Sequence, residues 1–356
     1  MFVNVSARKT AAAAKAAAAI LLCALPLVFA EESREGAKRG LELCLSVLLP
    51  SLFPVMAATG LMVKSGACAL TGRLLRRPSK WLFGVSGTMA PVILMSLIGG
   101  YPVGAAGISA LRRQGAVSEQ EAKRAALFAV GAGPGFVTGF VGAAIYGNAA
   151  VGRIMLAAQS ASVLLLSVPA RFLVPAGRES RKADGRLPPS LPFDRALVEA
   201  VTEAARNMGV ICAFVTVFSA MLALTEKLTA NETAQDAVFL LSEVCTAATR
   251  LAPKAPVALV AFAVGFGGIC VHCQILSALG EVKVNRLLFF LFRILQGALT
   301  ALLTYIALRL TPQTSPVFST VSPNTAVYGG STLSGAVLAG VVICFFISVR
   351  QSTRQH

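Results

Sequence analysis

A helix-breaking run, Gly99-Gly100-Tyr101-Pro102, interrupts an apolar segment of the sequence. Glycine tolerates the backbone angles at which a helix stops, and proline suits the first turn of a helix that restarts. Within a membrane, broken backbone is tolerated only where it lines a cavity or is buried in protein. A helix restarting at Pro102 would point its partial positive charge at that cavity, which predicts a site for an anion. The alternative is that Gly100, Gly104 and Gly107 only permit close helix packing.

A second break is predicted in a later apolar segment, at Gly131-Ala132-Gly133-Pro134-Gly135. Its glycines loosely resemble a dinucleotide-binding motif, but no strand precedes them, so we do not assign that function. Gly133 and Gly135 therefore join Gly100, Tyr101, Pro102 and Gly104 as candidate site residues.

An acidic residue lies between two apolar arms in the stretch Ser242-Glu243-Val244-Cys245-Thr246. A carboxylate at membrane depth is costly, so it indicates a function by default. Ser242, Glu243 and Thr246 are therefore candidate substrate ligands. The alternative is that this stretch reaches only the membrane interface.

Three further polar residues, His272, Gln274 and Arg293, lie in apolar segments of the second half. Arg293 could clamp an anion or pair with Glu243, and snorkelling to the membrane surface is the alternative. The run Cys270-Val271-His272-Cys273 could suggest metal or redox chemistry, but further ligands are missing. We therefore expect helix packing and no metal there, with His272 and Gln274 as possible polar groups of the cavity.

The composition indicates the setting of these residues. Hydrophobic residues make up 56% of the chain, charged residues 13%, and the mean hydropathy is +0.73. These values are typical of a polytopic membrane protein, and the continuous apolar runs favour an all-α fold over a barrel. The net charge of +16 comes from basic residues scattered over short connections, so we expect no nucleic-acid partner. The eight cysteines are expected to be buried hydrophobes rather than disulfides.

A membrane-crossing helix needs about 20 apolar residues. The first candidate also fits a signal peptide, and we favour a retained helix. Eight candidate spans are found, at 11–30, 41–63, 125–146, 152–174, 205–224, 256–279, 287–310 and 333–349.

Two segments, 81–112 and 228–251, do not have the length and composition of an ordinary membrane span and are interpreted as re-entrant helical hairpins. With a cytoplasmic N-terminus and two such hairpins, the predicted cytoplasmic segments hold 21 of the 32 lysines and arginines, and the external segments, 31–40 among them, hold six. Because basic residues collect in cytoplasmic loops, this asymmetry supports the hairpins.

The hairpins divide the chain into two halves with the same plan and opposite starting sides. Such an inverted repeat is typical of transporters whose substrate site lies at mid-membrane. We expect an N-terminal helix or signal anchor at 1–35, a first repeat at 36–175, a basic cytoplasmic linker at 176–195, a second repeat at 196–310, and an external loop with a last helix at 311–356.

The chain resembles the YlbJ (SpoVV) family of sporulation integral membrane proteins, relatives of the nucleoside-transporter-like Gate-domain proteins, over about residues 36–310. The motifs that carry the resemblance are Pro50-Ser51-Leu52-Phe53-Pro54, Gly100-Tyr101-Pro102-Val103-Gly104, Ser118-Glu119-Gln120-Glu121-Ala122, Gly133-Pro134-Gly135-Phe136, Phe266-Gly267-Gly268, Val271-His272-Cys273-Gln274 and Arg293. The sequence departs from the family pattern at Val130-Gly131-Ala132, where members often carry asparagines, and at Glu243-Val244-Cys245-Thr246, where they usually continue Glu-Val-Thr.

The resemblance implies transport of dipicolinic acid, a planar dicarboxylate, across the mother-cell-derived outer forespore membrane. We accordingly expect a multi-pass transporter of a small organic anion in the lipid bilayer, with no cofactor and with coupling to H⁺ or Na⁺ left open. A homo-oligomer is also left open.

Three other functions are weighed against this one. The first is transport of nucleosides or other small metabolites, and the second is a non-transporting Gate-domain scaffold. The third is a membrane protease, because Gly84-Val85-Ser86-Gly87 matches the GxSG pattern of rhomboid proteases and His272 could serve as a base. Nothing in the sequence brings Ser86 and His272 within hydrogen-bond reach, so we do not expect an enzyme.

Overall fold

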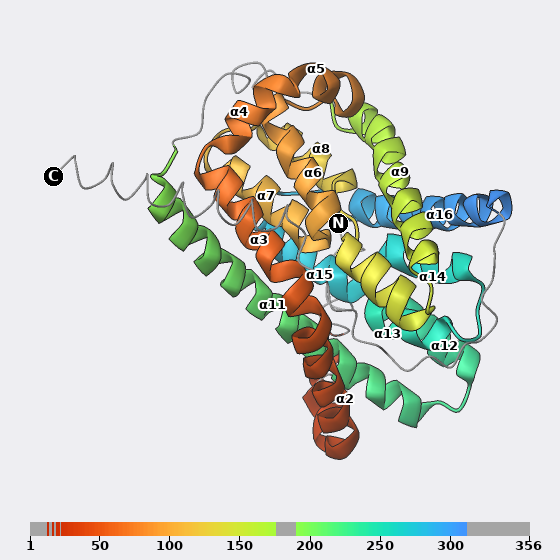
Figure 1. Cartoon of the computed structure of the whole chain (residues 1–356). Coiled ribbons are helices and arrows are strands. Elements are labelled where there is room, and N and C mark those ends of the chain that lie inside the picture. Colours follow the sequence, from red (N-terminus) through yellow and green to blue (C-terminus); the bar gives the residue numbers. More distant parts are fainter. Residues whose placement is uncertain (1–12, 14–15, 18, 22, 176–189, 312–356) are drawn as a thin grey trace, which may run out of the picture.

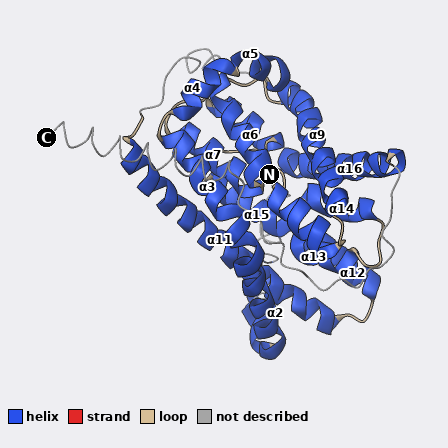
Figure 2. Cartoon of the chain, viewed as in Figure 1, coloured by secondary structure: helices blue, strands red, loops and turns tan. Residues whose placement is uncertain are grey.

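The computed structural model describes residues 13, 16–17, 19–21, 23–175 and 190–311. Within these residues every regular element is helical (Figure 2), which confirms the predicted all-α fold. Residues 1–12, residues 176–189 of the predicted linker and the predicted span 333–349 lie outside the described residues.

Five helices of the described chain are long and apolar enough to cross a membrane. Their length and composition confirm a polytopic membrane protein. They cover Ala30–Lys64, Ala149–Leu173, Phe193–Leu228, Val257–Leu279 and Arg286–Leu310.

The first half begins with one continuous helix, made of α2 (Ala30–Leu43), the π-helical turn η1 (Cys44–Leu48) and α3 (Leu49–Lys64). Four short elements follow, α4 (Ala67–Leu74), α5 (Arg76–Pro78), η2 (Ser79–Phe83) and η3 (Gly87–Met89). The helices α6 (Ala90–Gly99) and α7 (Tyr101–Arg113) then form a hairpin. A broken helix, α8 (Glu119–Phe128) and η4 (Gly135–Ile145), and the helix α9 (Ala149–Leu173) complete this half.

The second half has the same order of elements. It consists of the long helix α11 (Phe193–Leu228), a hairpin of α12 (Glu232–Ser242) and α13 (Val244–Leu251), a broken helix of α14 (Val257–Phe266) and α15 (Gly268–Leu279), and the helix α16 (Arg286–Leu310). Equivalent helices of the two halves pack together, α2 and α3 against α11, and α9 against α16. In Figure 1, α11 runs diagonally along one side of the molecule and crosses α2 and α3.

Residues 31–40, expected as an external segment between two spans, belong to the helix α2, so the predicted boundary at 35/36 falls inside a helix. Their sequence is polar, but α11 supplies partners for it. A Cβ at Gly36 would lie 2.6 Å from the Ser219 carbonyl oxygen, so the two backbones are in close contact. Glu32 also pairs with Lys227 at 3.2 Å. The second long helix likewise begins at Phe193, three residues inside the predicted linker.

The positions at which the helices break follow from their glycines. Gly100 has φ +92° and ψ −175°, a backbone conformation that residues with a Cβ avoid. Gly267 and Gly268 have φ of +87° and +75°, and they separate α14 from α15. The helical hydrogen bonds of α8 end near Phe128, before the glycines and proline of the second predicted break.

Candidate functional site

Each hairpin tip packs on the break of the broken helix in its own half. A Cβ at Gly100 would lie 3.1 Å from the backbone nitrogen of Gly133, so the first tip touches the first break. A Cβ at Gly268 would lie 3.0 Å from the backbone nitrogen of Glu243, so the second tip touches the second break. Glycine is required at these contacts because two backbones approach directly.

The two tips and the first break enclose one small cavity of about 30 Å³. It brings together six residues predicted for the site, Gly100, Tyr101, Pro102, Gly133, Glu243 and Gln274. The rest of the lining includes apolar residues that the sequence analysis did not name as candidate site residues, Leu48, Leu52, Phe136, Ile211, Val215 and Val271. A cavity of this size holds roughly two water molecules. The present cavity is therefore too small to hold an organic substrate.

The helix α7 begins at this cavity, and α15, which begins beside the second tip, contributes Val271 and Gln274 to its wall; neither helix has a side-chain cap. They run side by side in the same direction. A Cβ at Gly267 would lie 3.4 Å from Tyr101 at their first turns, and one at Gly280 would lie 3.6 Å from Ser109 at their far ends. Because a helix N-terminus carries partial positive charge and free N–H groups, both helices favour negative charge in the cavity.

Glu243 has a different environment from the one expected of a free intramembrane acid. Its side chain is only 1% exposed. The carboxylate accepts hydrogen bonds from the backbone nitrogens of Cys245 at 3.0 Å and Thr246 at 2.7 Å, and from the Thr246 hydroxyl at 2.7 Å. Glu243 is thus the N-cap of α13, and its charge satisfies the first turn of that helix.

Tyr101 connects the first hairpin to the second broken helix. Its hydroxyl donates a hydrogen bond to the carbonyl of Val264, in the last turn of α14. The carbonyls in the last turn of a helix have no partner within the helix. Tyr101 therefore satisfies a group that the break at Gly267 leaves open.

Arg293 makes the corresponding connection in the other direction. Its side chain is fully buried, and Nη1 donates to the Val130 carbonyl at 2.7 Å while Nη2 donates to the Leu127 carbonyl. These carbonyls lie where α8 ends. In the described part of the chain Arg293 has no carboxylate partner, and its Nε lacks a hydrogen-bond partner. The guanidinium therefore stabilises the helix break through these carbonyls and does not line the cavity.

Two glutamines that the sequence analysis missed support the same break. Gln296 donates to the Val130 carbonyl at 3.0 Å, and Gln159 of α9 donates to the Ala132 carbonyl at 2.8 Å. Both are fully buried. A signal was present in the sequence, because Arg293, Gln296 and Thr300 recur at helical spacing on one face of an apolar span.

His272 is buried among aromatic rings instead of facing the cavity. Nε2 lies 2.8 Å from the Phe266 carbonyl, which requires that nitrogen to carry the proton. The rings of Phe266, Phe289 and Phe290 pack edge-on around it. Among the described groups, Nδ1 has no hydrogen-bond partner.

The remaining predicted residues lie near the cavity but do not line it. A Cβ at Gly104 would lie 2.4 Å from the Ala129 carbonyl oxygen, and one at Gly135 would lie 3.0 Å from Ser51, so both glycines serve close packing. The Ser242 carbonyl contacts Gly268, and the Thr246 hydroxyl bonds to Glu243.

The structure also places the residues considered for other chemistry. The Ser86 hydroxyl is buried without a hydrogen-bond partner among the described residues, so it is not bonded to His272. Cys270 accepts a hydrogen bond from Gln274 at 3.3 Å and Cys273 is a free thiol. In the described ranges no group of three His, Cys, Asp or Glu side chains is placed to hold a metal ion.

One comparison with known proteins identifies a relative. The chain is 26% identical, over 79% of its own length and 79% of the relative, to the Sporulation integral membrane protein YlbJ of Bacillus subtilis (strain 168). No protein-family model and no solved structure matches the chain. This similarity supports the membership of the YlbJ family of sporulation integral membrane proteins that the sequence motifs indicate.

Proposed function

We propose that this protein transports a small organic anion, dipicolinate during endospore formation, with the substrate held between the two hairpin tips. The observation that carries the proposal is the cavity between the tips, which the uncapped first turns of α7 and α15 adjoin. A carboxylate can accept hydrogen bonds from such N–H groups. The fully buried charge of Arg293, directly behind the cavity wall, adds to the attraction.

A dicarboxylate is larger than the present cavity, so the cycle must include a state in which the tips separate. Transport then consists of opening the cavity to one side of the membrane at a time. Glu243, which lines the cavity, is the group that we assign to coupling with H⁺ or Na⁺.

The name of the relative supports a role in sporulation, and we place the protein in the outer forespore membrane. No enzymatic step and no resident cofactor belong to this proposal. The protein acts as a carrier.

Flux measurements in vesicles test the proposal. Purified protein is reconstituted, and uptake of labelled dipicolinate is followed with and without pH and Na⁺ gradients, with protein-free vesicles as the control. Protein-dependent uptake that unlabelled dipicolinate inhibits, and nucleosides do not, supports the proposal. Inhibition by nucleosides favours a nucleoside carrier, and saturable binding without flux favours a scaffold. Either result contradicts dipicolinate transport.

A further inference from the structure

A groove between α3, α7 and α11 begins where the tip cavity ends. The cavity is lined by Leu52 of α3 and Ile211 of α11, and the groove is lined by Met56 and Asn207, one helical turn further along the same two helices. On α7, Pro102 lines the cavity and Val103 lines the groove. The same three helices therefore carry both hollows in succession.

Small residues of all three helices form much of the groove's walls, beside larger side chains such as Met56 and Val63. A Cβ at Gly60 of α3 would lie 3.1 Å from the Cβ of Ala200 of α11, and one at Gly107 of α7 would lie 3.5 Å from Thr59. The groove has a volume of about 30 Å³, so the walls are almost in contact. Because the three helices meet here largely through small residues, a small separation of α11 from α3 and α7 would widen the groove along its length.

Ion pairs close the far end of the groove. Glu203 of α11 pairs with Lys64 of α3 at 3.2 Å and with Arg113 of α7 at 2.5 Å. One carboxylate thus connects all three helices at the groove's mouth. This end holds the segments 64–80 and 112–124, which the distribution of basic residues assigns to the cytoplasm.

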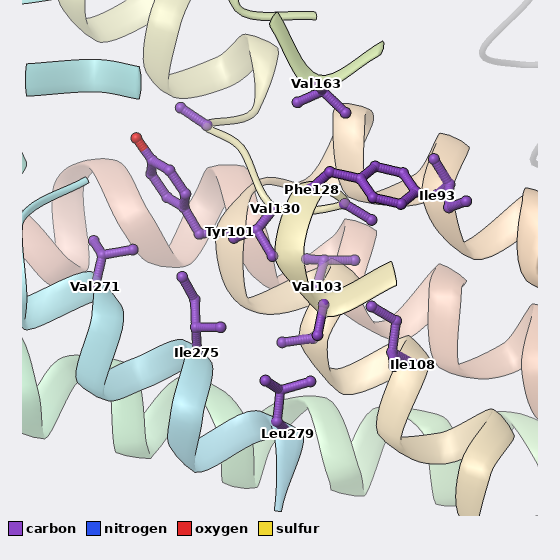
Figure 3. Packing of buried hydrophobic residues seen from close by; sticks show 14 of the residues in the cluster. Ile93, Tyr101, Val103, Ile108, Phe128, Val130, Val163, Val271, Ile275 and Leu279 are labelled. Atoms are coloured by element: carbon purple, nitrogen blue, oxygen red, sulfur yellow. The ribbon is translucent and has the colours of Figure 1, made fainter. Parts of the chain in front are cut away.

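The neighbouring seam between α7 and α15 is filled by contrast. Val271, Ile275 and Leu279 follow one another along α15 (Figure 3), and all three are buried. Both seams leave the tip cavity in the same direction, but the one along α15 holds large branched side chains. The groove along α3, α7 and α11 instead contains a hollow, lined by Met56, Val63 and Val103 as well as by small residues.

We infer that the groove between α3, α7 and α11 is the substrate's route between the tip cavity and the cytoplasmic face, with Glu203 as the latch at its mouth. The inference rests on the proposed transport function. A carboxylate of the substrate takes the place of Glu203 on Lys64 and Arg113, which releases α11 and draws the anion into the groove. Lys64 and Arg113 are the anion-binding groups of this mouth.

The first test removes the latch. Glu203→Gln leaves Lys64 and Arg113 without their shared carboxylate, so uptake of labelled dipicolinate at low concentration should rise by about ten-fold at low salt and lose this gain at high salt. The matched control is Glu199→Gln, one turn earlier on α11, which pairs with Lys64 at 3.1 Å and has a half-exposed side chain. Equal uptake by wild type, Glu203→Gln and Glu199→Gln would overturn the inference.

The second test closes the route. In the double variant Gly60→Cys with Ala200→Cys, the two Cβ atoms start 3.1 Å apart and need to move apart slightly to reach the roughly 3.5–4.5 Å of a disulfide. Oxidation should abolish uptake, and dithiothreitol should restore it. The control is Gly209→Cys, also on α11, where a Cβ has open space around it. Undiminished uptake by the cross-linked protein would overturn the route.

A labelling measurement covers the case in which the cross-link fails to form. Ala106→Cys places a thiol on the α7 wall of the groove. An anionic, membrane-impermeant thiol reagent should label it from the cytoplasmic side, above the wild-type background, and dipicolinate should slow the labelling. Absence of labelling would contradict the route. If wild-type vesicles show no uptake at all, the proposed function fails first, whereas wild-type uptake with insensitive variants contradicts the route alone.

Discussion

Arg293 and Val130, 163 residues apart in the sequence, are joined by a hydrogen bond of 2.7 Å at the end of α8. Tyr101 and Val264, also 163 residues apart, are joined at the end of α14. Each half of the protein thus satisfies the carbonyls that the helix break in the other half leaves without partners. The two breaks are therefore coupled, because moving either half away from the other exposes a buried polar group in both.

The first prediction concerns Arg293→Lys. A lysine keeps the charge, but its single amine cannot reach the Val130 and Leu127 carbonyls with the two-pronged geometry of a guanidinium. Gln296 still donates to the Val130 carbonyl, so the Leu127 carbonyl is the one left unpaired, at a cost of about 1–3 kcal/mol. Thermal unfolding in detergent should show a lower Tm, together with reduced flux. If Arg293 only bound substrate, the Tm would stay unchanged and only the KM for uptake would rise.

The second prediction concerns Tyr101→Phe, which removes one hydroxyl and leaves the Val264 carbonyl without its partner. The expected loss of stability is again about 1–3 kcal/mol. Tyr146→Phe is the matched control, because the Tyr146 hydroxyl is buried without a partner among the described residues. Its removal should leave Tm unchanged or raise it. Equal Tm values for the two variants would contradict the role assigned to Tyr101.

The third prediction concerns Gly100→Ala. An alanine at φ +92° and ψ −175° is strained by about 1–3 kcal/mol, and its Cβ would press on the Gly133 nitrogen at 3.1 Å. Flux should be lost as the first tip is displaced. Gly115→Ala is the control, since Gly115 also has a positive φ, +67°, but has nothing within 4 Å of its Cβ. Normal flux in Gly100→Ala would remove the first tip from the site.

The tips were predictable because their causes are local. A helix break is indicated by a glycine pair followed by proline, and by an acid flanked by apolar arms. Both signals are local and do not depend on the rest of the fold. The partners of Arg293 were not predictable, because they are carbonyls whose availability depends on where a helix 163 residues away ends. An anion and Glu243 were the natural candidates from sequence, and the folded chain supplies backbone oxygens instead.

The first long helix shows the same limit. Residues 31–40 are polar enough to be taken as a loop, and only their contacts with α11 explain why they are helical. Sequence alone does not show which helix will lie opposite.

The apolar wall of the cavity is a second case. Leu52 and Ile211 are indistinguishable in sequence from residues that face lipid, so no local signal could have identified them.

The fourth prediction concerns topology. Arg77→Cys and Gln120→Cys introduce thiols at exposed sites on either side of the α6–α7 hairpin, and Ala230→Cys places one before α12. An impermeant maleimide should label the first two from the cytoplasmic side and Ala230→Cys from the external side, with the wild-type protein as background. Labelling of Arg77→Cys and Gln120→Cys from opposite sides would mean that the hairpin crosses the membrane, and the inverted repeat would be lost.

The last prediction concerns Glu243→Gln. The carboxylate accepts three hydrogen bonds at the start of α13, whereas a glutamine presents one oxygen and one NH₂ group to the same donors. The mismatch should cost about 1–3 kcal/mol and lower the Tm. Asn231→Ala is the control, because Asn231 caps α12 with a bond of 3.1 Å to Ala234 at an exposed site. It should lose about 0.5–2 kcal/mol but keep its flux.

If Glu243 also couples transport, Glu243→Gln should in addition flatten the dependence of uptake on pH or Na⁺. A lowered Tm with unchanged pH and Na⁺ dependence would leave Glu243 as a helix cap alone, and an unchanged Tm would contradict the cap.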